Sequence, residues 1–233
     1  MDRITRSKLK TDRFAVEVEH SVEYVSEHRK QVFQYGAGAL LLVLIAGGIW
    51  YYRDRRHTVR QEELAAAMDI MQAPVAPSAP PGQLFYTTDD LKNAAAVNAF
   101  KPIYDKYSGT DEAAVASSYL GAISMDEGKL TDAEKYFQQA ADCGDKNLAS
   151  IGKLSLAQVY LSAGRQPDAE KLLRALYDKP TTFVSKEQAA IALARAISTT
   201  KPAEARKLLD PLRTERPAIS QAAITLLSQL PQQ

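Results

Sequence analysis

Apolar residues are distributed along the chain in ways that predict helices throughout. Residues 35–52 read YGAGALLLVLIAGGIWYY and contain no charged residue. Ahead of this run, Phe14, Val18, Val22 and Val25 fall on one stripe of a helix, with glutamates largely elsewhere. Beyond residue 83, short helical segments alternate with turns. The chain is therefore predicted to be all-α.

The apolar run predicts a single retained transmembrane helix over residues 35–52. A helix of the 17 residues from Gly36 is roughly 26 Å long, close to the hydrocarbon thickness of a bilayer. Tyr35 at one end, and Trp50, Tyr51 and Tyr52 at the other, are typical of aromatic belts at the two interfaces. A buried core helix is the alternative.

The run and a proline cluster divide the chain into four predicted parts. Residues 1–34 form a tail whose amphipathic helix either docks on a partner or on the membrane surface, or simply extends the anchor. Residues 53–82 comprise a helical extension and a spacer, which the prolines between residues 74 and 81 make stiff and extended. Residues 83–233 form the folded domain.

That domain contains an internal repeat. Ala133, Ala169 and Ala205 begin similar helical segments and lie 36 residues apart, and another helix precedes each of them. Gly128 and Gly164 close the first two preceding helices. The unit is a helix, a short turn and a second helix, repeated about every 36 residues. Small residues at these spacings let adjacent helices approach closely.

Residues near the turns predict where the second helix of each unit starts. Thr131 and Glu134 have the spacing of a capping box, in which two side chains satisfy backbone groups reciprocally. Pro167 and Pro202 suit the first turn of a helix, where the missing amide hydrogen has no cost.

The repeated unit resembles the tetratricopeptide repeat. In that family Leu-Gly and then a tyrosine in the first helix are paired with Ala and then an aromatic residue in the second. The matching residues are Leu120, Gly121, Ala133 and Phe137 in the first unit, Leu156, Ala157, Tyr160, Ala169 and Leu173 in the second, and Ala192, Leu193, Ala205 and Leu209 in a degenerate third. The resemblance implies an α-solenoid.

Charge and reactive residues exclude several functions. From residue 83 onward there are 18 basic and 18 acidic residues, which argues against a nucleic-acid partner. Cys143 is the only cysteine, and all three histidines precede residue 83, so no metal or cofactor site is expected there. Adjacent acids such as Asp89 and Asp90 diverge on a helix and do not form a catalytic pair. The chain is predicted not to be an enzyme and to take no small-molecule substrate.

The combination of one anchor, a linker and a helical repeat domain resembles the YfgM-like proteins of bacterial inner membranes. The resemblance covers this architecture and residues 104–212, most specifically the phrase NLASIGKLSLAQVYLSAGR. It implies a cytoplasmic N-terminus, a periplasmic repeat domain and a place beside the Sec translocon. Translocon components, periplasmic chaperones or exported polypeptides would be the partners. Basic residues close to the anchor favour the reverse orientation, but long domains translocate largely regardless of flanking charge.

By the geometry of the tetratricopeptide family, the first helices of the units line a concave protein-binding groove. The predicted lining is Val115, Ser118, Ala122, Met125, Asp126, Ile151, Leu154, Gln158, Leu161, Ser162, Glu187, Ala190, Ala194 and Ile197. This set is mostly apolar and lacks the Lys and Asn carboxylate clamp of some relatives, which favours apolar segments as ligands. Packing against neighbouring helices is the alternative role for these residues. A structural or assembly subunit of a bacterial membrane complex is the alternative function.

Overall fold

The computed structural model describes residues 29–78 and 80–231, and the regular elements in these ranges are helices, apart from one isolated β-bridge. The chain divides into two compact parts, Met1–Thr58 and Val59–Gln233. The predicted amphipathic stripe of residues 14–25 lies outside the described residues. The all-α prediction is confirmed within the described ranges.

The first element, α2, runs from Arg29 to Gln72 and contains the whole apolar run. Its residues from Leu40 to Ile45 are 49% to 67% exposed. Six successive residues turn through more than a full circle of a helix, so aliphatic side chains are exposed on every side. No described residue of the first compact part covers them.

The predicted transmembrane helix is not found: in the part of the chain that the structure describes, no helix is long and apolar enough to cross a membrane. The side chains of Ile49, Trp50 and Tyr52 belong to the predicted span but lie outside the described residues.

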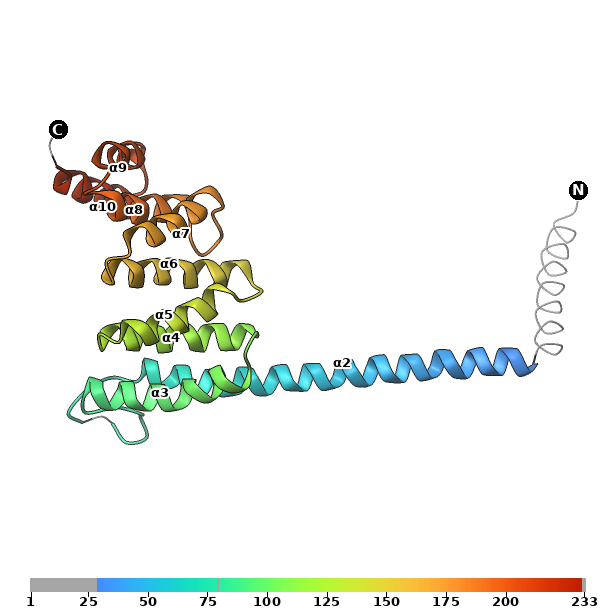
Figure 1. Cartoon of the computed structure of the whole chain (residues 1–233). Coiled ribbons are helices and arrows are strands. Elements are labelled where there is room, and N and C mark those ends of the chain that lie inside the picture. The colour runs from blue at the N-terminus through green and yellow to red at the C-terminus, as the bar shows by residue number, and fades with distance from the viewer. Residues whose placement is uncertain (1–28, 79, 232–233) are drawn as a thin grey trace, which may run out of the picture. The chain divides into compact units, whose positions relative to one another are not determined.

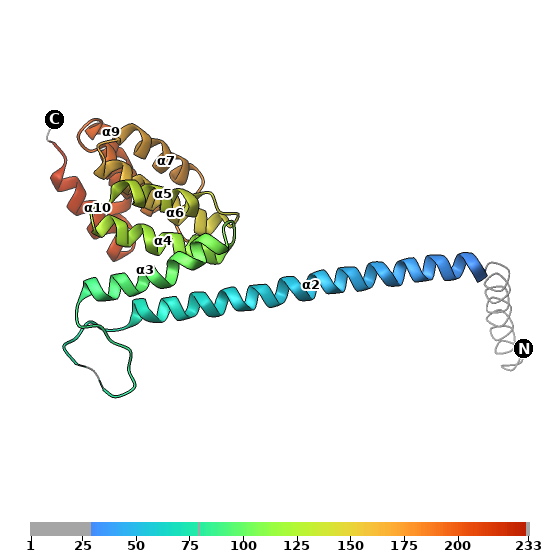
Figure 2. The ribbon, with the colours of Figure 1, turned by 60° about the horizontal axis from the view of Figure 1, so that its bottom comes forward.

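The C-terminal end of α2 belongs to the folded domain. Ala67 is 1% exposed and packs with Ala96, Phe100 and Ile103 of α3, which runs from Asp89 to Lys106. Figure 2 shows α3 alongside this end of α2. The second compact part accordingly begins at Val59, and not at residue 83 as the proline cluster predicted.

The proline-rich segment between α2 and α3 folds back on itself. Its two ends meet in a parallel bridge between Val75 and Tyr86, where the Tyr86 amide donates to the Pro74 carbonyl at 3.0 Å. The Ala76 amide donates to the Tyr86 carbonyl at 2.9 Å. The predicted stiff, extended spacer is wrong, because the segment connects two helices that pack side by side.

The remaining helices form three helical hairpins and a C-terminal cap, stacked in chain order (Figure 1). We call α4–α5, α6–α7 and α8–α9 the first, second and third repeats. Their bounds are α4 Asp111–Asp126, α5 Leu130–Ala141, α6 Lys146–Ser162, α7 Gln166–Asp178, α8 Lys186–Ile197 and α9 Pro202–Leu209. A 3-10 helix, η1 (Asp210–Thr214), and α10 (Pro217–Gln229) come after them.

The 36-residue register predicted from the alanines is confirmed. Ala133, Ala169 and Ala205 are all 0% exposed, as close helix packing requires. Gly128 and Gly164 both end a first helix with positive φ, at 74° and 73°. A side chain there would be strained, so glycine stops these helices at equivalent points.

The two predictions of helix starts have opposite outcomes. Pro167 and Pro202 lie in the first turns of α7 and α9, as predicted. The capping box at Thr131 is wrong, because α5 already begins at Leu130 and its N-cap, Lys129, makes no side-chain cap bond. The turn at Gly128 leads directly into the helix, which places Thr131 inside the first turn.

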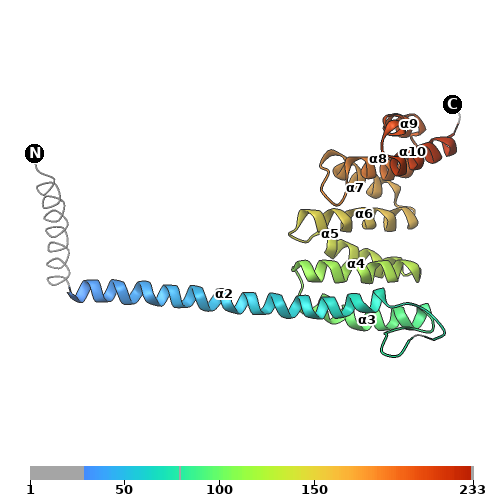
Figure 3. The same ribbon diagram turned by 180° about the vertical axis from the view of Figure 1, so that it is seen from behind.

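Helix α10 closes the C-terminal end of the stack. Ala223, Leu226 and Leu230 pack into the same apolar core as Leu209 of α9 and Leu193 of α8. Figure 3 shows α10 beside α8, with which it is in contact. The last repeat is therefore covered by an additional helix, as a solenoid requires at its ends.

Candidate protein-interaction groove

A groove lies on the surface shared by α4 and α6, the first helices of the first two repeats. It holds a cavity of about 340 Å³. Six predicted groove residues come together in its lining: Ser118, Ala122, Met125, Asp126, Ile151 and Gln158. Tyr119, Ser155 and Phe137 of α5 complete it.

The floor of the groove is shaped by two aromatic side chains. Phe137 is 4% exposed and reaches between the first helices because Gly121 leaves room for its ring. A Cβ atom at Gly121 would lie 2.8 Å from that ring. Tyr119 is stacked on Phe100 of α3 with ring centroids 4.8 Å apart. Both rings are therefore fixed before any ligand binds.

The lining offers apolar contact and one negative charge. Ala122 and Ile151 are exposed to solvent, and Met125 is half-buried. Asp126 is exposed and is the only charged side chain among the described residues that line the cavity. The Ser118 hydroxyl is already used, since it donates to the Ala114 carbonyl at 3.0 Å. The groove can thus bury an aliphatic or methionine side chain and attract a cation at its edge.

Four predicted residues of α4 and α6 do not line the cavity of the groove. Val115 is half-buried, and Ser162 at the end of α6 is exposed. Leu154 and Leu161 are half-buried and pack against the apolar core of the C-terminal half. Leu154 and Leu161 therefore contribute to the packing of the domain and not to the groove.

The third repeat does not extend the groove. Ala190, Ala194 and Ile197 are at most 2% exposed and belong to the apolar core. Their prediction as lining is corrected: these positions of α8 pack inside the domain. Glu187, in the first turn of α8, is half-buried, and a hydrogen bond with Ser185 lowers the pKa of its carboxyl.

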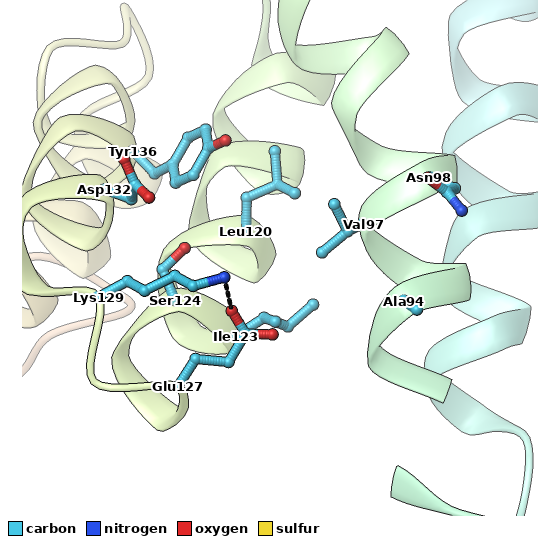
Figure 4. A pocket seen from close by; sticks show the side chains of 10 residues that line it. All are labelled: Ala94, Val97, Asn98, Leu120, Ile123, Ser124, Glu127, Lys129, Asp132 and Tyr136. Carbon is cyan, nitrogen blue, oxygen red and sulfur yellow. Dashed lines mark ion pairs between the residues drawn. The ribbon is translucent and has the colours of Figure 1, made fainter. Parts of the chain in front are cut away.

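A second cavity, of about 300 Å³, was not predicted from the sequence. It lies between α3 and the first repeat, and Figure 4 shows Asn98 of α3 across it from Tyr136 of α5. Lys129 at its edge forms an ion pair with Glu127 at 2.7 Å, and this hydrogen bond raises the pKa of the lysine. One signal of this cavity is present in the sequence: Ser124 of the first repeat is equivalent to Tyr160 of the second, 36 residues later, and is much smaller.

Ion pairs connect the second helices of successive repeats, and these too were not predicted. Arg165 pairs with Glu134 at 2.8 Å, and Lys201 pairs with Glu170 at 2.6 Å. The basic members of the two pairs are 36 residues apart in sequence, as are the acidic members. The Lys201 and Arg174 hydrogen bonds lower the pKa of Glu170. Among the described residues, no cluster of His, Cys, Asp or Glu could hold a metal ion.

The stacked hairpins and the apolar groove define a helical-repeat domain of the protein-interaction class, which is generally non-catalytic. A match to the family described as Tetratricopeptide repeat-like domain covers residues 32–190, more than half of the chain. The chain therefore belongs to this family. Searches of the curated proteins and of the solved structures give no match. The narrower resemblance to YfgM-like proteins finds no support in these comparisons.

Proposed function

We propose that the α4–α6 groove binds an apolar segment of a partner protein, and that the chain acts as a tethered protein-interaction module. The observation that carries this proposal is the cavity itself, which brings six exposed or half-buried residues of α4 and α6 around a fixed aromatic floor. A partner side chain that enters it would gain about 1.5–3 kcal/mol by leaving water. The charge of Asp126 favours partner segments with a lysine or arginine next to the apolar residue.

The tether in this proposal is the apolar segment of α2. Aliphatic side chains from Leu40 to Ile45 are exposed around the whole helix, and such a surface needs a lipid or protein cover. We propose that a bacterial inner membrane covers it, with residues 1–34 in the cytoplasm and the repeat domain in the periplasm. There the groove would receive exported polypeptides or their chaperones near the translocon. The support for this narrower part is the exposed segment and the resemblance of the architecture.

Site-specific photocrosslinking tests the groove. A benzoylphenylalanine placed at Ala122, which is exposed within the groove, should form a crosslink to an apolar peptide that carries one basic residue. Gln138 is also exposed but lies on α5 outside the groove lining, so it is the matched control position. Equal crosslinking at both positions would refute the groove as the binding surface.

Protease accessibility tests the tether and its orientation. Protease added to spheroplasts with an intact inner membrane should digest the repeat domain and leave residues 1–34 protected. Protection of the repeat domain until lysis would place it in the cytoplasm. Release of the full chain from membranes by alkaline carbonate would show that the segment is not embedded in lipid.

A further inference from the structure

The cavity between α3 and the first repeat has a filled counterpart one repeat later. In the first repeat the Lys129 amide donates to the Ser124 carbonyl at 2.8 Å, and in the second the Arg165 amide donates to the Tyr160 carbonyl at 2.7 Å. Each donor and each acceptor is 36 residues from its equivalent. The backbones therefore run the same course, and the side chains of Ser124 and Tyr160 leave from equivalent places.

In the second repeat a tyrosine occupies this place. Tyr160 packs against a buried apolar cluster, and Leu130 of α5 and Leu172 of α7 pack against the same cluster. The guanidinium of Arg165 lies 4.1 Å from the centre of the ring, a cation–π arrangement. Arg165 is held there by its ion pair with Glu134. Burial raises the pKa of the Tyr160 hydroxyl.

In the first repeat the same place is empty. Ser124 is too short to fill it, and Tyr136 does not fill it either, because its ring packs edge-on against Tyr104 at 5.0 Å. Figure 4 shows the open space, with Leu120 between Tyr136 and Val97. Among the lining residues that the structure describes on α3, none is acidic, and Lys129 pairs with Glu127 of its own repeat. The parts that surround Tyr160 are thus largely present, but the ring is missing.

The third repeat shows that a small residue at this place does not by itself open a cavity. Ala196 is the equivalent of Tyr160, yet it is only 3% exposed. The Gln166 side chain of α7 reaches this place and donates to the Ala196 carbonyl. The α3 residue equivalent to Gln166, two repeats of 36 residues earlier, is Ala94, whose methyl group cannot reach across in this way. Ser124 is itself only 7% exposed, but a cavity stays open beside it.

We propose that this cavity is a second binding site, which receives a tyrosine side chain of a partner protein in the way the second repeat holds its own Tyr160. Leu120, Ile123 and Val97 provide apolar contact for the ring, and Lys129 at the edge provides the cation for its face. Asn98 and Asp132 offer acceptors for the phenol hydroxyl. The site therefore selects tyrosine over a purely apolar side chain.

This site is separate from the α4–α6 groove. Two sets of α4 residues point to opposite sides of the helix at 100° per residue. Those in the cavity are Leu120, Ile123 and Ser124, and those in the groove are Ala122, Met125 and Asp126. A partner could occupy both sites at once, with an apolar segment in one and a tyrosine in the other. Failure of either proposal leaves the other intact.

The test is a titration of the full-length chain in mild detergent with N-acetyl-tyrosinamide, monitored by amide chemical shifts in ¹H–¹⁵N spectra. A small ring in a partly open cavity should bind with a dissociation constant on the order of 1 mM. Shifts should concentrate at Val97, Ser124 and Lys129. The variant Ser124→Tyr should lose them, because the new ring fills the cavity from within, as Tyr160 does in the second repeat.

Two further variants keep the result unambiguous. Ala94→Trp blocks the cavity from the exposed side of α3 without a change in the core, so it serves if Ser124→Tyr fails to fold. Ala122→Trp fills the other groove and should leave the tyrosinamide shifts unchanged. Absence of shifts at the cavity in the natural chain would overturn the proposal. So would shifts that persist in both cavity-filling variants.

Discussion

The first helices of the second and third repeats occupy equivalent positions, yet one contributes to a surface and the other to the core. Gln158 of α6 is exposed at the groove, whereas Ala194 of α8, 36 residues later, is 0% exposed. Ala190 and Ile197, which were also predicted to line the groove from α8, lie in the core as well. Sequence register alone made these residues equivalent, and the structure separates them.

The difference arises from the helix that packs next to each of these two helices. The surface of α6 faces α4, with Gly121 and Phe137 fixing a hollow between the two helices. Helix α8 is instead in contact with α10, which packs into the same core. A helical-repeat domain must cover the hydrophobic surface of its last repeat. Here α10 covers that surface, so α8 does not extend the groove. The binding capacity is therefore concentrated in the first two repeats.

Removal of residues 217–233 should have the largest effect. This deletion exposes the core around Leu209 and removes the buried Leu226 and Leu230. We expect a loss of unfolding free energy on the order of 5 kcal/mol, because each buried leucine contributes about 1.5–3 kcal/mol. Thermal unfolding measured by circular dichroism would quantify it. An unchanged melting temperature would mean that α10 is dispensable and that α8 could line a groove.

A matched pair of substitutions separates core from groove directly. Ile197→Asp should destabilise the domain by about 3–5 kcal/mol, since it buries an unpaired charge. Ile151→Asp at the exposed groove position should change stability by less than about 1 kcal/mol. Urea titration of both variants gives the two values. Similar losses in both would show that the groove position is also core.

Acid should weaken the groove-bearing half through one buried ion pair. Arg60 of α2 donates to Glu112 of α4 at 3.1 Å, and Glu112 is 6% exposed. Burial alone would raise the pKa of Glu112, but hydrogen bonds from the backbone and from Arg60 outweigh it and lower the pKa. A lowered pKa contributes stability that is present above the unfolded value and is lost as the pH falls through the folded value.

The measurement for this pair is hydrogen exchange between pH 6 and pH 3. When the pH drops below about 4.5, the ordinary glutamate pKa, protection in α3 and α4 should decrease before protection in α7 and α9 does. In α7 and α9 the ion pairs of Glu170 contribute little, because their basic partners, Arg174 and Lys201, are exposed to solvent. Glu112→Gln should cost about 1–3 kcal/mol at neutral pH and remove the difference. A uniform loss of protection along the domain would contradict the role of the pair.

The fold was predicted well from the local spacing of alanines and glycines, because this spacing depends on short-range packing between helices. The 36-residue alanine spacing and the helix-ending glycines each depend on one helix and its nearest neighbour. The proline-rich segment was misread for the opposite reason. Its prolines exclude a helix, but only the packing of Ala67 against α3 decides that the segment must fold back.

The candidate site could be predicted only in part, for a related reason. Ser118, Ala122 and Ile151 were found because the register gives the side of the helix on which a residue lies. The burial of Ala194 depends on α10, which is distant in sequence. The second cavity exists because position 124 carries a small serine where the second repeat carries a tyrosine. A pattern search reports residues that match and overlooks the volume that a short residue leaves open.

The measurement that tests the central claim most directly is a peptide titration of groove and control variants. A labelled peptide with one leucine or methionine next to an arginine is titrated against the full-length chain, and fluorescence anisotropy gives the dissociation constant. Ala122→Trp, which fills the cavity between α4 and α6, should weaken binding at least about tenfold, or about 1.4 kcal/mol. Gln138→Trp, at an exposed position outside the groove, should leave it unchanged. Equal affinities of the two variants and the natural chain would contradict the claim that this groove is the binding surface.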